Sequence, residues 1–328
     1  MPDLASAIVA GDPRAVARAL TVVENDADAS AALLAALAGH VGRAHRVGVT
    51  GPPGVGKSTL VAALAKGWRA AGRRVAIGAV DPTSPYSGGA LLGDRVRMTA
   101  LSGDAGVFIR SLATRGALGG LARAAQDMAD VLDAAGFDPV VLETVGVGQS
   151  EVAIAAAADT VVVALAPGSG DGVQAMKGGL LEVADLLVVN QADRAGAEGL
   201  VADLESAVEL RSTGRTPRIL STVATTGVGL AALGAAIDAH RAELQTGDGL
   251  STRRQARAAG RIRDEVERRL QSALWAAAGS ALAHLSGEVA AGRTTVAAAA
   301  GRLLADTPLP ASFAAPPLPP SPKTSRSP

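Results

Sequence analysis

The chain has 328 residues, of which 48% are hydrophobic and only 2% aromatic, and its 31 Lys and Arg balance its 31 Asp and Glu. This balance argues against a large nucleic-acid interface, and the absence of cysteine excludes disulfides, cysteine-ligated metals and cysteine nucleophiles. We expect a cytoplasmic protein without a membrane span, because no stretch of about 18 apolar residues is free of charge and no leader-like segment follows Met1.

Residues 1–44 carry apolar side chains at helical spacing, which predicts an N-terminal helical arm. Over residues 45–246, short β-branched runs alternate with helix-like segments. The strand-like runs are 47–50, 74–80, 140–143, 160–165, 186–190 and 218–221, and the helix-like segments are 57–71, 118–135, 173–184, 196–212 and 229–243. This alternation predicts an α/β domain with a mostly parallel central sheet flanked by helices.

No strand-like run follows Gly249. Residues 247–305 are expected to form a C-terminal helical segment, which begins with an Arg-rich helix over 251–272 and continues as an Ala-rich stretch. Residues 306–328 are rich in Pro and Ser and have no periodicity. Such a composition predicts a disordered tail, because it cannot bury a core.

The segment from Gly51 to Ser58 reads Gly-Pro-Pro-Gly-Val-Gly-Lys-Ser and matches the phosphate-binding loop of P-loop proteins. It lies between a strand-like run and a helix-like segment, which is the context that this loop requires. Its glycines allow backbone N–H groups and a helix N-terminus to surround a phosphate. Lys57 is expected to bridge the β- and γ-phosphates, and the Ser58 hydroxyl to bind Mg²⁺.

A second motif, Asn190-Gln191-Ala192-Asp193, comes at the end of a strand-like run. It is similar to the Asn-Lys-x-Asp motif with which GTPases bind guanine, except that Gln191 replaces the lysine. The Asp193 carboxylate would accept hydrogen bonds from guanine N1–H and the 2-amino group, a pair of donors that adenine lacks. The motif therefore favours guanine over adenine, although a polar turn after a strand has the same composition.

Two further segments carry acids beside a predicted strand. Glu143 ends an apolar strand and Gly146 follows it, an arrangement in which the acid holds Mg²⁺ and the Gly amide contacts the γ-phosphate. Asp81 and Asp94 lie in a Gly- and Pro-rich segment that suits a switch loop near the metal. Both segments are also compatible with ordinary turns. The four histidines show no metal-ligand spacing, so we expect them at surface or hydrogen-bonded positions.

Several long strings occur in this chain in a fixed order. They are the segments 10–19, 42–48, 81–85, 88–95, 108–110, 118–120, 143–151, 184–190 and 222–224. In these strings the chain resembles the MeaB/ArgK-type P-loop GTPases, which are GTP-dependent chaperones of cobalamin-dependent methylmalonyl-CoA mutase and related acyl-CoA mutases. The resemblance covers about residues 8–270, and its string Glu-Thr-Val-Gly-Val-Gly-Gln-Ser-Glu is highly specific.

This resemblance implies roles for the matching positions. The residues that would bind GTP or GDP are Gly51, Gly54, Val55, Gly56, Lys57, Ser58, Thr59, Asn190, Asp193, Thr222, Val223 and Ala224. The residues that would bind Mg²⁺ are Ser58, Asp81, Asp94 and Glu143, and those that would serve catalysis are Lys57, Asp94, Glu143, Gly146 and Gln149. A further segment, 167–177, would respond to the mutase.

The resemblance also implies a homodimer formed through C-terminal helices. No arginine finger is readable from the sequence, so we expect slow intrinsic GTP hydrolysis that a partner accelerates. The GTP state would control the loading of adenosylcobalamin into an acyl-CoA mutase such as methylmalonyl-CoA mutase, and its protection there. No nucleic-acid or membrane partner is expected.

Three alternatives compete with this function. An ATP-using ATPase or kinase linked to basic amino-acid transport stays open, because Gln191 could relax the choice of base. A nickel chaperone GTPase is disfavoured by the lack of cysteine and of a histidine cluster. A scaffold that holds nucleotide without turnover is disfavoured by the intact Lys57, Ser58 and Glu143.

Overall fold

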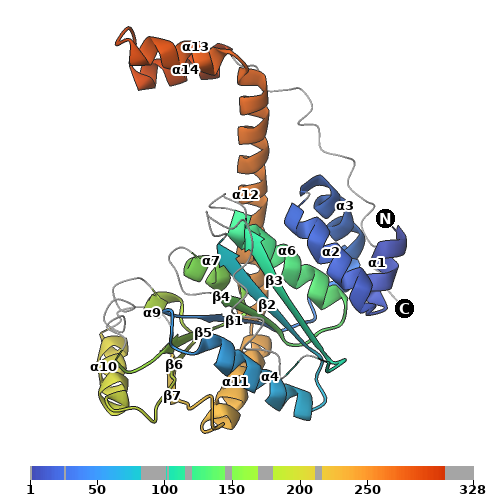
Figure 1. Ribbon diagram of the computed structural model, residues 1–328, viewed down its shortest axis with the longest axis vertical. Helices are drawn as coiled ribbons and strands as arrows, with labels where there is room; N and C mark the ends of the chain where they lie inside the picture. The colour runs from blue at the N-terminus through green and yellow to red at the C-terminus, as the bar shows by residue number, and fades with distance from the viewer. Residues whose placement is uncertain are drawn as a thin grey trace. The chain divides into compact units, whose positions relative to one another are not determined.

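The computed structural model describes residues 2–25, 27–82, 101, 103–114, 120–144, 150–168, 180–210 and 216–306 (Figure 1). The chain forms two compact units, Met1–Arg257 and Ala258–Pro328. The tail that we expected over 306–328 lies outside the described residues, apart from Asp306. Among the described helices, none combines the length and the apolar character that a membrane span requires.

A parallel sheet of seven strands forms the centre of the first unit, in the order β3-β2-β4-β1-β5-β6-β7. The strands are β1 (Arg46–Thr50), β2 (Val75–Pro82), β3 (Val107–Thr114), β4 (Val140–Thr144), β5 (Thr160–Leu165), β6 (Leu186–Val189) and β7 (Arg218–Ser221). The strands β4, β1, β5 and β6 are buried along their whole length, as parallel strands covered on both faces should be. The predicted α/β class is confirmed.

Helices cover both faces of the sheet (Figure 1). Those of the first unit are α1 (Pro2–Val9), α2 (Pro13–Asn25), α3 (Ala27–Leu37), the 3-10 turn η1 (Ala38–His40), α4 (Lys57–Ala70), α6 (Gly120–Ala134), α7 (Ser150–Ala157), α9 (Leu180–Val183), α10 (Ala197–Glu209), α11 (Leu230–Thr246) and the first turns of α12 (Gly249–Ala278). The N-terminal helices share one core with α6, in which Ile8, Leu20 and Leu33 are buried with Met128. Helices α4 and α11 pack on the other face.

Two elements were not among those that the sequence predicted. Strand β3 lies at the edge of the sheet and is half-buried, and its apolar run is interrupted by Arg110, whose guanidinium lies 3.4 Å from Glu24 on α2. Helix α7 runs into β5 in one nearly continuous apolar stretch, in which Asp159 marks the end of the helix and the start of the strand. Neither the interrupted apolar run of β3 nor the short break between α7 and β5 produces a clear hydrophobic periodicity.

Close packing of α7 on β1 requires a glycine in the middle of the strand. A Cβ on Gly48 would lie 2.9 Å from both Ile154 Cγ2 and Ala158 Cβ, which is closer than carbon atoms approach in folded proteins. The missing side chain therefore allows the helix to lie directly on the strand that leads into the phosphate-binding loop.

The amino ends of β5 and β6 carry buried carboxylates that bind the start of α12. Asp159 is fully buried and receives Arg257 at 3.0 Å and Arg254 at 3.3 Å. Asp185 accepts hydrogen bonds from the two terminal guanidinium nitrogens of Arg253, at 2.5 and 2.8 Å. Burial raises the pKa of Asp159, but the charges of Arg257 and Arg254 outweigh this and leave the pKa lowered. The Arg-rich stretch thus begins by anchoring α12 to the first unit.

Two histidines share one hydroxyl at the same edge of the sheet. Thr160 Oγ1 lies 2.8 Å from His45 Nε2 and 2.7 Å from His240 Nδ1, and His240 Nε2 lies 3.3 Å from Asp185 Oδ1. A hydroxyl has one proton, so at most one of the two ring nitrogens accepts from Thr160 and at least one donates to it. Burial lowers the pKa of His45 to about 4, against the opposing charge of Asp159. Of the surface or hydrogen-bonded positions expected for the histidines, these two occupy buried, hydrogen-bonded ones.

The described residues of the second unit form helices joined by short turns. It contains the rest of α12, then α13 (Ala281–Ala290) and α14 (Val296–Asp306). Leu285, Ala299 and Leu303 form a small core between α13 and α14, and Arg302 lies 2.7 Å from Glu288. Along α12, Ile262, Val266 and Leu270 are exposed by 66%, 50% and 38%, so this apolar stripe has no cover within the described chain.

Replacing His45 by Gln should flatten the acid side of the stability profile. Unfolded His45 takes up a proton below about pH 6.5 and folded His45 only below about pH 4, so acidification over that interval favours the unfolded state. The loss amounts to at most about 3 kcal/mol in the wild type, and His45→Gln should remove most of it. Urea denaturation from pH 7 to pH 4 measures the difference, with His40→Gln as the control. Parallel profiles for His45→Gln and the wild type would contradict the assignment.

Candidate nucleotide site

The phosphate-binding loop turns sharply between β1 and α4. Its glycines adopt left-handed backbone angles, with φ of 137° at Gly51, 80° at Gly54 and 88° at Gly56. A Cβ on Gly51 would lie only 2.0 Å from the carbonyl oxygen of Ala164 in β5, so no other residue fits there. The turn delivers the chain into the N-terminus of α4, where the helix dipole favours an anion.

Lys57 and Ser58 are the first residues of α4 and both are buried. Lys57 Nζ donates to the carbonyl oxygens of Gly51 and Pro52, each at 2.8 Å, so the loop holds the ammonium group at its centre. Thr59 follows in the same helical turn and is half-buried. The predicted lysine thus lies where a phosphate bound by the loop would meet a positive charge.

The structure brings Ser58 and Glu143 together. Ser58 Oγ donates to Glu143 Oε1 at 2.6 Å, and the two side chains are 5% and 2% exposed. They meet because β1 and β4 are neighbours, with Val49 paired to Glu143 in the register. A hydroxyl and a carboxylate oxygen are hard ligands of the kind that Mg²⁺ takes, usually with water and phosphate oxygens. This donor set fits a magnesium ion.

Asn190 connects three segments at the carboxyl ends of the strands. Its Nδ2 donates to the carbonyl oxygen of Val55 at 2.9 Å, while its Oδ1 accepts from Thr222 Oγ1 at 3.1 Å and from the Ala224 N–H at 3.2 Å. Val223 lies between these two contacts and its N–H donates to the carbonyl oxygen of Val228. The predicted base-binding residue Asn190 is therefore in contact with the phosphate-binding loop, and it also binds residues 222 and 224.

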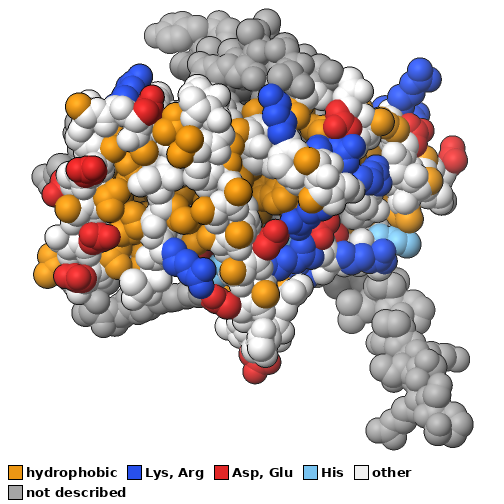
Figure 2. Space-filling model, turned by 90° about the horizontal axis from the view of Figure 1, so that it is seen from below, with side chains coloured by type: hydrophobic (Ala, Val, Ile, Leu, Met, Phe, Trp, Pro, Cys, Tyr) orange, Lys and Arg blue, Asp and Glu red, His pale blue; other side chains and the backbone are white. Residues whose placement is uncertain are grey.

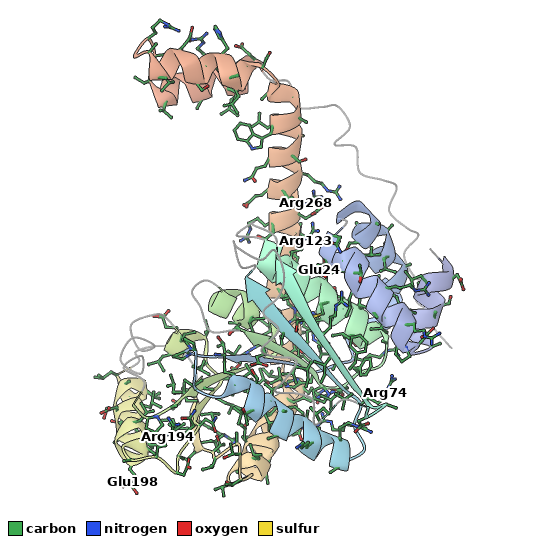
Figure 3. All side chains as sticks on the ribbon, in the orientation of Figure 1. Glu24, Arg74, Arg123, Arg194, Glu198 and Arg268 are labelled. Atoms are coloured by element: carbon green, nitrogen blue, oxygen red, sulfur yellow. The ribbon has the colours of Figure 1, made fainter. Side chains whose placement is uncertain are left out.

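Asp193 lies in the turn between β6 and α10, and its side chain is exposed. Arg194 and Glu198 follow it near the beginning of α10 (Figure 3). The helix itself has an acidic outer face, made by Glu198, Asp203, Glu205 and Glu209, and acidic side chains line that border of the molecule in Figure 2. Asp193 is thus not part of this acidic face, because it lies in the turn that follows β6 and precedes α10.

Some predicted residues are not placed by the structure. Asp94, Gly146 and Gln149 lie outside the described residues, as does most of the segment 167–177. Asp81 belongs to β2, where the register pairs it with Ala113 of β3. The roles of these residues stay predictions.

Two contacts near the loop have no counterpart among the expectations drawn from the sequence. Thr50 Oγ1 lies 3.1 Å from Thr144 Oγ1, and both hydroxyls are buried at the carboxyl ends of β1 and β4. Gln191 Nε2 donates to the carbonyl oxygen of Gly54 at 3.1 Å. In the sequence, Gln191 is visible only as a departure from the usual lysine, because a side-chain contact across the sheet edge has no local pattern.

The sequence matches the family described as "Methylmalonyl Co-A mutase-associated GTPase MeaB" over residues 16–279. The chain belongs to the MeaB family. A Pyrococcus horikoshii protein provisionally named a GTPase is 48% identical over 270 residues, which cover 81% of this chain and 84% of that protein. GTPase ArgK of Escherichia coli is 42% identical over 187 residues, or 56% of each chain.

Two further comparisons agree with membership of the MeaB family. The mouse protein "Methylmalonic aciduria type A homolog, mitochondrial" is 41% identical over 191 residues, which cover 56% of this chain and 46% of that protein. The crystal structure of an LAO/AO transport system kinase has a TM-score of 0.70 at 27% identity, and the match covers 93% of this chain and 96% of that one. The chain is therefore a MeaB-family P-loop GTPase related to ArgK.

Proposed function

We propose that this MeaB-family GTPase is a GTP-dependent switch that assists a cobalamin-dependent acyl-CoA mutase, such as methylmalonyl-CoA mutase, in loading and protecting adenosylcobalamin. The observation that carries the proposal is the meeting of two sets of residues at one edge of the sheet. Lys57, Ser58 and Glu143 form a phosphate and metal site, and Asn190 joins it to the segment expected to bind guanine.

The phosphate end of the site would act by positioning and by neutralising charge. Lys57 would leave its loop carbonyls to contact the β- and γ-phosphates, and Ser58 and Glu143 would hold Mg²⁺. The metal would offset the charge that develops on the phosphates as water attacks the γ-phosphate in line. In this proposal Asp81 and Asp94 complete the acidic surroundings of the metal, and Gly146 and Gln149 respond to the γ-phosphate.

The base end of the site would select guanine. Asp193 would accept from N1–H and the 2-amino group, and residues 222–224 would close over the base. Asn190 is 2% exposed and its amide is used for contacts within the protein, so it would hold the segments in place.

The partner is proposed from the family and from the surface of α12. The family is described as associated with methylmalonyl-CoA mutase, and one relative carries the name of methylmalonic aciduria. The exposed apolar stripe of Ile262, Val266 and Leu270 would serve homodimer formation in the cytoplasm. A kinase linked to amino-acid transport is suggested only by the name of the structural neighbour, and no contact at the site favours it.

Replacing Asp193 by Asn should change the base that the protein prefers. The Asn amide group would face the 2-amino group of guanine donor to donor, whereas xanthine presents a carbonyl oxygen at that position. We expect GDP binding to weaken about 100-fold and XDP binding to strengthen, as measured by calorimetric titration with Mg²⁺. Asp203→Asn, on the exposed face of α10, is the matched control. An unchanged affinity for GDP in Asp193→Asn would refute this role of Asp193.

The mutase should accelerate GTP hydrolysis. We expect the rate to rise about ten-fold or more when purified cobalamin-free methylmalonyl-CoA mutase is added, because a partner that orders the switch segments lowers the barrier by roughly 1.4 kcal/mol per ten-fold. Phosphate release is measured with and without the mutase, and Lys57→Ala serves as the inactive control. Hydrolysis that is equally slow with methylmalonyl-, ethylmalonyl- and isobutyryl-CoA mutases would contradict the proposed partnership.

A further inference from the structure

Gln191 has an unusual backbone conformation for its residue type. Its φ is 58°, and among the described residues it is the only one besides glycine with a positive φ. A side chain with a Cβ is strained in this left-handed region, and such strain persists where the surrounding contacts require it. The contacts that Gln191 makes should therefore show what keeps it in this conformation.

Both ends of the residue are bound to segments of the nucleotide site. The side-chain Nε2 donates to the carbonyl oxygen of Gly54 at 3.1 Å, beside the bond from Asn190 Nδ2 to the carbonyl oxygen of Val55. Two successive side-chain amides thus bind two successive carbonyls of the phosphate-binding loop. The contact is close, because a Cβ on Gly56 would lie 2.7 Å from Asn190 Nδ2 and 3.6 Å from Gln191 Nε2.

The main chain of Gln191 shapes the turn that carries Asp193. The Arg194 N–H donates to the Gln191 carbonyl oxygen at 3.0 Å, and the next residue, Ala192, donates its N–H to the carbonyl oxygen of Thr222 at 3.0 Å. A displacement of the Gln191 side chain would therefore be transmitted to the position of the Asp193 carboxylate and to residue 222.

We propose that Gln191 is a positioning residue that couples the phosphate-binding loop to the guanine-binding turn through the single neutral hydrogen bond to Gly54. The inference rests on the proposed guanine-nucleotide function. When phosphate orders the loop, the Gly54 carbonyl holds the Gln191 amide and so fixes the turn that bears Asp193. A bound phosphate then strengthens the binding of guanosine, and guanosine strengthens the binding of phosphate by the same factor.

The choice of glutamine rather than lysine fits this use of the side chain. Its amide supplies one donor to the loop, and its Oε1 is buried without a hydrogen-bond partner among the described residues. The bond to Gly54 is thus the single hydrogen bond that the side-chain amide makes in the described part of the protein. Removing the donor should abolish the coupling, while a different donor at the same position should preserve it.

The test measures the affinity for guanosine with and without saturating Mg²⁺ and inorganic pyrophosphate. In the wild type, pyrophosphate should tighten guanosine binding about five-fold, which is the scale of one neutral hydrogen bond. In Gln191→Met, which keeps the length of the side chain but has no donor, the factor should fall to about one. In Gln191→Lys, which offers a donor to the same carbonyl, a clear coupling should remain.

The coupling factor is a ratio of affinities within one variant, so a uniform loss of stability does not change it. If Gln191→Met does not fold, Gln191→Asn replaces it, since Asn suits the left-handed backbone but is one methylene too short to reach Gly54. A wild type that binds neither GDP nor guanosine would overturn the proposed function and this inference with it. If the wild type binds GDP but the Met or Asn variant shows the same coupling factor as the wild type, this inference alone would be overturned.

Discussion

The parallel order of β4, β1, β5 and β6 is the constraint on which the site depends. Parallel strands bring all their carboxyl ends to one edge, and the side chains that follow each strand then meet there. Glu143 near the end of β4 reaches Ser58 after β1, and Asn190 after β6 reaches the same loop. The approach is so close at Gly51 that even a Cβ would collide with β5. A rigid sheet edge therefore sets the distances at which a nucleotide would be held.

The opposite edge of the same strands has a different use. Asp159 and Asp185 precede β5 and β6, where they are buried and paired with arginines from the start of α12. Each buried carboxylate is satisfied by more than one donor, so the charges are tolerated in the interior. One end of the strands thus carries the residues that would contact the proposed ligand, while the other anchors the helix that leads into the second unit. The buried strands β1, β5 and β6, which are hydrogen-bonded to their neighbours, join these two ends.

Short sequence motifs predicted the phosphate-binding loop and the Asn190 turn. The features that the sequence did not predict depend on contacts between residues far apart in the chain. The phosphate-binding loop and the Asn190 motif are short patterns at strand ends, so the sheet topology alone brings them together. Edge strand β3 escaped prediction because Arg110 interrupts its apolar run to reach α2. The anchoring of α12 joins Arg253 to Asp185 across 68 residues, and such pairs have no periodic signature. The hydrogen bond from Gln191 to Gly54 was likewise invisible in the sequence.

The central claim is that this sheet edge binds guanine nucleotides. Calorimetric titration of the wild-type chain with GDP and with ADP, both with Mg²⁺, tests it most directly. The account predicts tight binding of GDP and at least about 100-fold weaker binding of ADP, because adenine cannot supply both hydrogen-bond donors to Asp193. Equal affinities, or a preference for ADP, would contradict the claim and favour an ATP-using function.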